Sequence, residues 1–403
     1  MILLKGKYAE GIVYSDVREE KGINQIQLLL NQPFTEGSHP RFMPDYHAGL
    51  GSVIGTTMFV TDEICPNLVG VDIGCGIRTE RFRLSGDIDL EVLDQWIRSS
   101  IPSGFNVHSK ERQMDYIERL AMQRHIKDAS RLKKSLGTLG GGNHYIEIGQ
   151  GEQGDEYILT VHSGSRNLGL QVAEYYQKCA VKQSKFRKDQ FQGQARKLQR
   201  DERSFFGAQQ EWERHQDAIN QPKGLETLHR GTREYDDYLR DMNICVEFAL
   251  ENRREMAELL LDALGAERIQ GFDTIHNYIE RRPEGNPHIL RKGAVSAQEG
   301  ELLTIPLNMR DGNLICRGLG NPEWNYSAPH GAGRLMSRSQ ARKELKLEDF
   351  HRTMEGIFTT SISQRTLDEA PFAYKPMEDI IRFIGDTVEI LQLVRPIYNF
   401  KAN

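Results

Sequence analysis

The chain has few cysteines, few aromatic residues and no long apolar run. Its five cysteines stand apart along 403 residues and include no CxxC pair, so we expect no disulfide framework and a reducing compartment. No apolar stretch approaches the roughly 20 residues that a membrane-spanning helix needs. The opening segment MILLKGKYAEGIVYSD also lacks the apolar core of a secretory signal. These absences predict a cytoplasmic protein that makes no membrane contact.

The chain also lacks an excess of positive charge. Lysine and arginine number 52, aspartate and glutamate number 57, and the formal net charge is −5. A nucleic-acid-binding surface must then be a local patch, because no global positive field exists to attract phosphate.

Three zones differ in texture, and together they predict a mixed α/β (α+β) fold with a helical insertion. Residues 1–170 are rich in glycine and in short strand-like runs, residues 171–265 have helical spacing, and residues 266–403 return to glycine-rich loops and short strands. The last zone predicts helices over 337–357 and 376–393 and a terminal strand, LVRPIYNFK. We interpret residues 1–403 as one catalytic domain, with mixed sheets around a metal cleft and a helical insertion at about 171–265.

The helical zone contains a basic cluster whose meaning the sequence leaves open. It consists of Lys182, Lys185, Arg187, Lys188, Arg196, Lys197 and Arg200. Such a cluster is either a solvated helix face or a contact to an RNA backbone, since phosphate binding needs grouped lysines and arginines.

Residues able to bind a metal or act as a nucleophile recur beside glycines. They occur in VGVDIGCGIR (69–78), TLGGGNHYIEI (138–148), TVHSGSRNLG (160–169), DTIHNYI (273–279) and SAPHGAGR (327–334). Glycine beside a polar ligand lets the backbone approach an ion or a phosphate. A single histidine is more often structural, so the set and not any one member predicts a metal centre. Imidazole and thiolate alone favour zinc, whereas the carboxylate of Asp72 favours harder ions such as manganese.

These segments, with MPDYHAGLG (43–51) and RKGA (291–294), resemble the RtcB-type RNA-splicing ligases. The motifs DIGCG, GGGNHYIE, HSGSRNLG, HNY, RKGA and HGAGR stand in the family's order. The resemblance extends over nearly the whole chain, to the terminal Lys401.

The resemblance implies a site in which each residue has a role. Two Mn(II) ions would be bound by Asp72, Cys75, His144, His162 and His276, with Cys75 bridging them. His330 would be the nucleophile that takes up GMP from GTP. Nucleotide contacts would come from Asn143, Glu147, Asn277, Pro306, Asn308, Met309, Gly331, Ala332, Gly333, Arg334, Tyr374 and Lys401. Arg166 would contact an RNA phosphate, and Glu147 would select guanine.

The implied activity is a GTP- and Mn(II)-dependent RNA ligase. It would join 3′-phosphate or 2′,3′-cyclic phosphate ends to 5′-hydroxyl ends, in tRNA splicing or in RNA repair. The sequence does not decide between these substrates, nor whether a helper protein is needed. Two alternatives stay open: a metal phosphoesterase that uses the same ions without a covalent step, and a non-catalytic RNA-binding protein.

The chain departs from the family pattern in one loop. The family's PGSMG-like turn is here Pro306-Leu307-Asn308-Met309-Arg310, and Ala328-Pro329 stands before His330. These changes suggest a divergent subfamily and leave the phosphate contacts of this loop open. His47 and Asp45 in MPDYH are interpreted either as support for the metal site or as simple turn residues. The other four cysteines are expected to be buried structural thiols.

Overall fold

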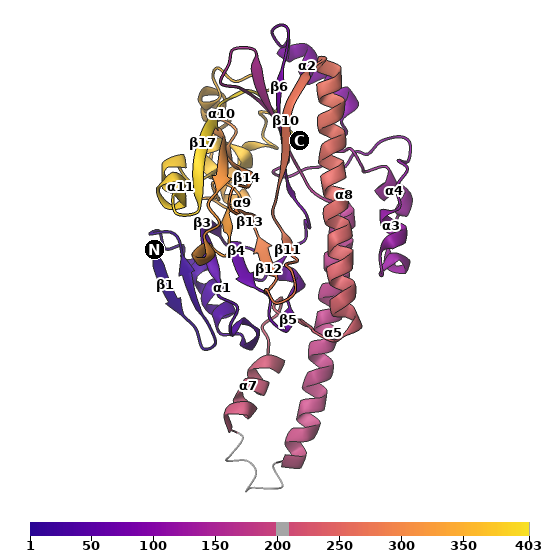
Figure 1. Cartoon of the computed structure of the whole chain (residues 1–403), viewed down its shortest axis with the longest axis vertical. Coiled ribbons are helices and arrows are strands. Elements are labelled where there is room, and N and C mark those ends of the chain that lie inside the picture. The colour runs from indigo at the N-terminus through magenta and orange to yellow at the C-terminus, as the bar shows by residue number, and fades with distance from the viewer. Residues whose placement is uncertain (199–208, 403) are drawn as a thin grey trace.

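The secondary structure alternates along the chain and builds several sheets (Figure 1). Among the described sheets only the six-stranded one is mixed, through the parallel pairing of Ile12–Val13 with Arg41–Phe42. The structure is a computed structural model that describes residues 1–198 and 209–402. The predicted mixed α/β architecture is confirmed.

The described helices vary from single turns to rods of more than thirty residues. They are α1 (Glu20–Leu30), α2 (Leu90–Ser100), α3 (Tyr116–Arg119), α4 (Ala129–Lys133), α5 (Arg166–Leu198), α7 (Gln209–Ile219), α8 (Arg233–Leu264), α9 (Arg338–Glu344), α10 (Leu347–Thr353) and α11 (Met377–Ile384).

The strands fall into two larger sheets and three smaller ones. The six-stranded sheet has the order β1 (Ile2–Lys5), β2 (Glu10–Val13), β3 (Arg41–His47), β4 (Ile54–Phe59), β12 (Ile289–Lys292), β11 (Tyr278–Glu280). The five-stranded sheet has the order β10 (Glu267–Ile275), β6 (Gly76–Arg83), β8 (Glu156–Ser163), β7 (Tyr145–Gln150), β18 (Pro396–Lys401). The smaller sheets pair β13 (Ala294–Ser296) with β16 (Ser327–Pro329), join β14 (Leu302–Asn308), β15 (Gly312–Gly318) and β17 (Val388–Val394), and pair β5 (Glu63–Ile64) with β9 (Leu228–His229).

The five-stranded sheet is antiparallel and has two different faces. Successive side chains of a strand point to opposite faces, so Ile146 and Val161 lie on the apolar face. There they pack in one cluster with Met256 and Leu260 of α8. The opposite face carries Tyr145, Glu147 and His162, and further along β8 it carries Ile158, which packs against Ile315 and Val394.

Helix α8 is defined at both ends by local signals. The Thr232 side chain accepts a hydrogen bond from the Tyr235 N–H at its start, as an N-cap does. Gly265 ends it with φ of 62°, the left-handed conformation that glycine adopts at low cost. Leu239, Met242 and Ala249 on this helix are buried. This long amphipathic helix thus covers the back of the sheet.

Two predicted elements differ from the structure. The predicted helix over 376–393 is correct only for α11, because β17 follows it as an edge strand paired with β15. Gly385 follows the helix, and the VEILQLV run after it is rich in residues that favour strands. The predicted helical segment 337–357 is divided into α9 and α10, with the extended Leu345 and Lys346 between them. The terminal strand is confirmed as β18.

The helical zone contains α5, α7 and α8, and α5 and α7 project from one end of the molecule (Figure 1). Lys182, Lys185 and Lys188 of the basic cluster are exposed. Arg187 instead contacts His229 and forms an ion pair with Glu63 at 3.9 Å. The side chains of Arg196, Lys197 and Arg200 lie outside the described residues.

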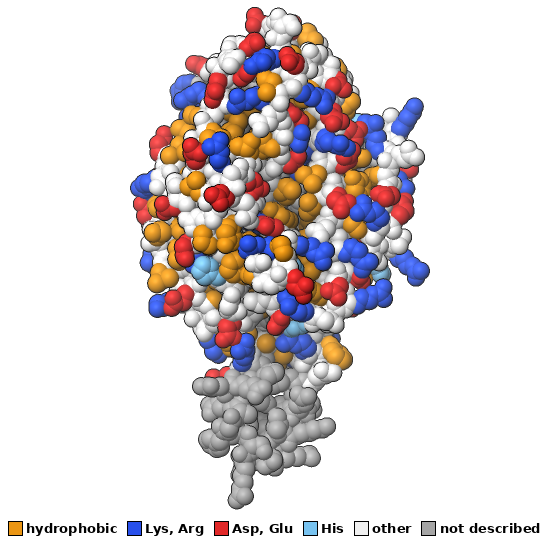
Figure 2. All heavy atoms as spheres, viewed as in Figure 1, with side chains coloured by type: hydrophobic (Ala, Val, Ile, Leu, Met, Phe, Trp, Pro, Cys, Tyr) orange, Lys and Arg blue, Asp and Glu red, His pale blue; other side chains and the backbone are white. Residues whose placement is uncertain are grey.

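No described helix is both long and apolar enough to cross a membrane. Acidic and basic side chains are interspersed on the face shown in Figure 2. Cys65, Cys245 and Cys316 are buried as predicted, while Cys179 is half-buried.

Candidate active site

The five predicted metal ligands lie in two groups that share one residue. Asp72, Cys75 and His144 form the first group, and Cys75, His162 and His276 form the second. Within each group the potential ligand atoms lie within 4.8 Å of one another. Cys75 is therefore placed where a thiolate could contact two ions.

One edge of the five-stranded sheet collects these ligands from four distant segments. Cys75 stands just before β6, His144 just before β7, His162 near the end of β8, and His276 just after β10. Because these strands are antiparallel neighbours, the starts of β6 and β7 meet the ends of β8 and β10. The His276 N–H donates to the Cys75 carbonyl at 2.8 Å, and this hydrogen bond joins the two ligand-bearing segments.

His162 and His276 are in the form that binds metal, whereas burial raises the pKa of the Cys75 thiol well above its usual range, so this thiol must lose its proton to bind a cation. Burial lowers the pKa of His162 and His276 well below the usual range, and nearby histidines lower it further, so both rings are neutral. Their Nδ1 atoms are buried and have no hydrogen-bond partner among the described residues. Cys75 Sγ lies 3.3 Å from His162 Nε2, and His144 Nε2 lies 3.1 Å from Asp72 Oδ2. The potential ligand atoms lie close together, and two ring nitrogens have no hydrogen-bond partner among the described residues. This arrangement fits bound cations better than a closed hydrogen-bond network.

His330 stands beside the metal ligands and is held by a buried carboxylate. Its Nδ1 lies 2.6 Å from Oδ2 of Asp45, whose side chain is completely buried while that of His330 is 16% exposed. The His330 ring packs edge-on against that of His276, with centroids 4.9 Å apart. A Nδ1–H donated to Asp45 leaves the lone pair on Nε2, so this nitrogen is the one available for attack.

The position of Asp45 is itself fixed by its neighbours. The Lys375 ammonium donates to the carbonyls of Pro44 and Tyr46, on either side of Asp45. Gly333 packs against the Asp45 backbone so closely that a Cβ there would lie 2.3 Å from the Asp45 oxygen, and its φ is +73°. Asp45 is thus a positioning residue for His330. His47, the other residue of the motif, contacts the backbone carbonyl of Asp45 at 2.9 Å.

A cavity of about 670 Å³ opens in front of His330, within the size range of small-ligand sites. It brings together all twelve residues for which the family resemblance implies nucleotide contacts, and four of the five metal ligands. These lining residues are Asn143, Glu147, Asn277, Pro306, Asn308, Met309, Gly331, Ala332, Gly333, Arg334, Tyr374 and Lys401, with Asp72, Cys75, His162 and His276.

An ionised glutamate organises the far end of this cavity. Glu369 is buried and forms ion pairs with Lys401, Arg334 and Arg338. Burial alone would raise its pKa, but these three cations outweigh burial and hold the pKa at about 2. Tyr374 donates to Glu369 at 2.6 Å. Lys401 and Tyr374 are therefore held in place before any ligand binds.

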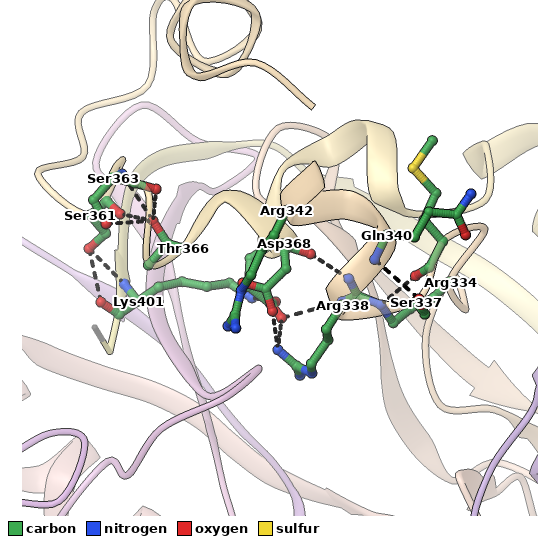
Figure 3. Close-up of polar contacts among 12 residues, drawn as sticks. Arg334, Ser337, Arg338, Gln340, Arg342, Ser361, Ser363, Thr366, Asp368 and Lys401 are labelled. Atoms are coloured by element: carbon green, nitrogen blue, oxygen red, sulfur yellow. Dashed lines mark hydrogen bonds and ion pairs between the residues drawn. The ribbon is translucent and has the colours of Figure 1, made fainter. Parts of the chain in front are cut away.

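Asp368, the neighbour of Glu369, ties helix α9 to this end of the cavity. Its carboxylate accepts from Arg338 at 2.8 Å and from Arg342 at 3.1 Å, as Figure 3 shows. The Ser337 side chain accepts the Gln340 N–H and so fixes the start of α9, the helix that carries Arg338 and Arg342.

A second buried network lies on the cavity side of the five-stranded sheet. The Tyr145 hydroxyl donates to Asn313 Oδ1 at 2.8 Å, and Asn313 Nδ2 donates to one Glu147 oxygen at 2.5 Å. Asn399 Nδ2 donates to the other Glu147 oxygen at 2.7 Å. Burial raises the pKa of Glu147 to about 8 despite these amide donors.

The divergent 306–310 loop forms a self-contained turn between β14 and β15. Asn308 Oδ1 accepts the N–H groups of Arg310 and Asp311, each at 3.0 Å, and its Nδ2 donates to Asp311 at 2.7 Å. The Arg310 guanidinium pairs with Asp311 and Thr353. The loop therefore gives the cavity the wall formed by Pro306–Met309, while the added charge of Arg310 is engaged on the outside.

Two predicted contact residues are engaged by protein groups. Arg166 is not among the residues that line the cavity; its guanidinium packs on Gly140 and lies 3.3 Å from His144 Nδ1. Asn277 lines the cavity, yet its amide donates to the Asp72 carbonyl and accepts the Gly293 N–H. Both residues thus hold the metal-site loops in this structure.

Sequence reasoning missed three residues of the site and did not identify the partner of a fourth, Asp45. The role of Asp45 was hidden because its partner, His330, is 285 residues away. Glu369 stands in the same DEAPFAYK segment as Tyr374, and that proximity was the available signal. Asn313 and Asn399 carry no motif, so only strand pairing reveals them.

Two groups of metal-type ligands, a carboxylate-held histidine and a nucleotide-sized cavity together are typical of metal-dependent enzymes. The sequence model of the tRNA-splicing ligase RtcB family matches residues 25–402. A protein named RNA-splicing ligase RtcB from Escherichia coli strain K12 is 30% identical over 400 residues, which cover 90% of each chain. A tRNA-splicing ligase RtcB from Aeropyrum pernix is 27% identical over 487 residues, with 97% of this chain and 93% of that one covered. The chain belongs to the RtcB family of RNA ligases.

Proposed function

We propose that this protein joins an RNA 3′-phosphate end to a 5′-hydroxyl end, using GTP and Mn(II), through GMP carried on His330. The observation that supports this proposal most directly is the Asp45–His330 pair at the mouth of the cavity. A hydrolytic metal site needs no histidine oriented in this way, and a simple RNA binder needs neither the pair nor the ligand groups.

Asp72, Cys75 and His144 would hold one ion, and Cys75, His162 and His276 the other. Bound Mn(II) would neutralise charge on phosphoryl oxygens and orient them. The mixture of thiolate, imidazole and carboxylate also suits zinc, so metal identity is part of the test.

The protein groups perform the remaining chemistry. His330 Nε2 attacks the α-phosphorus of GTP, the bond to the β-phosphate oxygen breaks, and pyrophosphate leaves. An oxygen of the RNA 3′-phosphate then attacks the same phosphorus, and the P–N bond to His330 breaks. Finally the 5′-hydroxyl attacks the activated 3′-phosphate, loses its proton to solvent, and releases GMP. A 2′,3′-cyclic phosphate end would first be opened to the 3′-phosphate.

The cavity wall supplies nucleotide recognition in this scheme. Lys401, Tyr374 and Glu147 belong to its polar lining, and Gly331, Ala332 and Gly333 carry at most a methyl group, so their backbone could approach the phosphates. Glu147 would accept N–H groups of guanine, which favours GTP over ATP. Whether Arg166 reaches an RNA phosphate depends on its release from His144.

The test is covalent labelling. The protein is incubated with Mn(II) and α-labelled GTP and quenched in denaturant, with His330→Ala and Asp94→Asn as variants. Acid-labile, base-stable label on the wild type and on Asp94→Asn, absent from His330→Ala, is the expected result. Transfer is then followed with RNA that carries 2′,3′-cyclic phosphate and 5′-hydroxyl ends. No label on a folded protein that has bound its metal would refute the mechanism, and zinc replaces manganese in a parallel series.

A further inference from the structure

A buried hydrogen-bond acceptor that no described residue satisfies lies in a side chain that lines the cavity. Asn399 lines the cavity, its side chain is 1% exposed, and its Oδ1 is buried without a hydrogen-bond partner among the described residues. Leaving a buried polar atom unpaired is unfavourable, so such an atom beside a ligand cavity points to a ligand donor.

The direction of this acceptor is fixed by its neighbours. The Asn399 amide donates through Nδ2 to Glu147, so its oxygen is the atom that remains free. Glu147 in turn has its other oxygen occupied by Asn313, and the Tyr145 hydroxyl fixes the orientation of Asn313. In this arrangement, with Glu147 accepting from both amides, the Asn399 oxygen is the atom left unpaired.

Strand register places this acceptor next to Glu147. Asn399 of β18 lies directly opposite Glu147 of β7, and Lys401 lies opposite Tyr145. Because side chains alternate along a strand, these four residues share the cavity face of the sheet. Asn399 Oδ1 and Glu147 thus form an adjacent pair of acceptors.

We propose that Asn399 is a specificity-determining residue that, with Glu147, accepts the two N–H donors of the guanine Watson–Crick edge. This inference rests on the proposed function. Guanine presents N1–H and the N2 amino group side by side. Adenine presents an unprotonated N1, which would face an acceptor, and hypoxanthine lacks the N2 amino group. A site built to accept N–H groups discriminates strongly against a ligand that lacks them.

The experiment compares single-turnover labelling of the metal-loaded protein by α-labelled GTP, ITP and ATP. The wild type is expected to prefer GTP over both ITP and ATP. Asn399→Leu removes the acceptor at similar volume and is expected to reduce the GTP/ITP or the GTP/ATP ratio by about tenfold. Each ratio is measured within one preparation, so a change in folded fraction cancels. Asn399→Ala gives the same measurement if leucine prevents folding.

The possible results separate this inference from the proposed function. Wild-type ratios near one, or ratios unchanged within twofold in both variants, would overturn the role of Asn399 while GMP transfer stands. Failure of the wild type to label with any nucleotide would remove the proposed function and this inference with it. A tenfold loss of either ratio in a protein that still labels supports the assignment.

Discussion

The hydrogen bond between Asp45 and His330 gives the sharpest prediction. Asp45→Asn keeps the shape of the side chain but removes the charge that accepts the His330 Nδ1–H at 2.6 Å. A hydrogen bond to a charged group contributes about 1.5–3 kcal/mol, and 1.36 kcal/mol corresponds to a factor of ten in rate. We therefore expect GMP transfer to His330 to slow about 10- to 150-fold.

Stability should respond differently from activity. Asp45 is fully buried, and its Oδ1 has no partner among the described residues. Removing a buried charge offsets much of the lost interaction, so the free energy of unfolding should change by about 1 kcal/mol or less.

The assay is single-turnover labelling at saturating GTP, normalised to folded protein by urea unfolding. Asp94→Asn is the matched control, because Asp94 is also buried but contacts Arg98, Thr360 and Tyr398 instead of the cavity. A labelling rate of Asp45→Asn within threefold of the wild type would show that Asp45 does not orient His330.

Three further predictions concern the metal, the pH dependence and the backbone. Cys75→Ala should abolish binding of both ions in a metal titration, whereas His276→Ala should leave one, because only Cys75 belongs to both ligand groups; equal loss in both variants would contradict two separable sites. The folded-state pKa of Glu147 is raised to about 8 from 4.5, so its contribution to stability is complete below pH 4.5 and is lost as pH rises through 8. From pH 5 to pH 9 the wild type should therefore lose up to about 4 kcal/mol of unfolding free energy relative to Glu147→Gln. A difference between the two proteins that does not change with pH would argue that Glu147 is ionised throughout. Gly333→Ala should lower both the thermal midpoint and the labelling rate, because its Cβ would lie 2.3 Å from the Asp45 oxygen; normal activity would show that Asp45 tolerates displacement.

The sequence predicted the parts of the site that depend on residue type beside glycine. Cys75, His144, His162 and His276 stand in short segments whose residue types alone indicate metal binding. The structure brings their potential ligand atoms together in two groups. The mixed architecture and the terminal strand also followed from local pattern.

The rest depends on pairings that a single sequence does not encode locally. Asp45 meets His330, and Glu147 meets Asn313 and Asn399, only because β3, β7, β15 and β18 come together from distant parts of the chain. The predicted helix over 376–393 failed for a related reason, since the partner strand β15 determines that β17 is extended. Arg166 was assigned to an RNA phosphate by resemblance; in the structure it packs on Gly140 and His144, and its contact with RNA stays a prediction.

The register of the five-stranded sheet also fixes the distance between the metal ligands and the end of the nucleotide cavity. His162 lies opposite Tyr145, and Tyr145 lies opposite Lys401, so the metal ligand and the end of the nucleotide cavity are two strand spacings apart. At about 4.8 Å per spacing this is roughly 10 Å, a distance set by backbone hydrogen bonds and not by side-chain choice. Deleting one residue from β18 would turn Lys401 and Asn399 into the apolar layer beneath. The distance between the metal ligand and the end of the cavity is thus as rigid as the sheet itself.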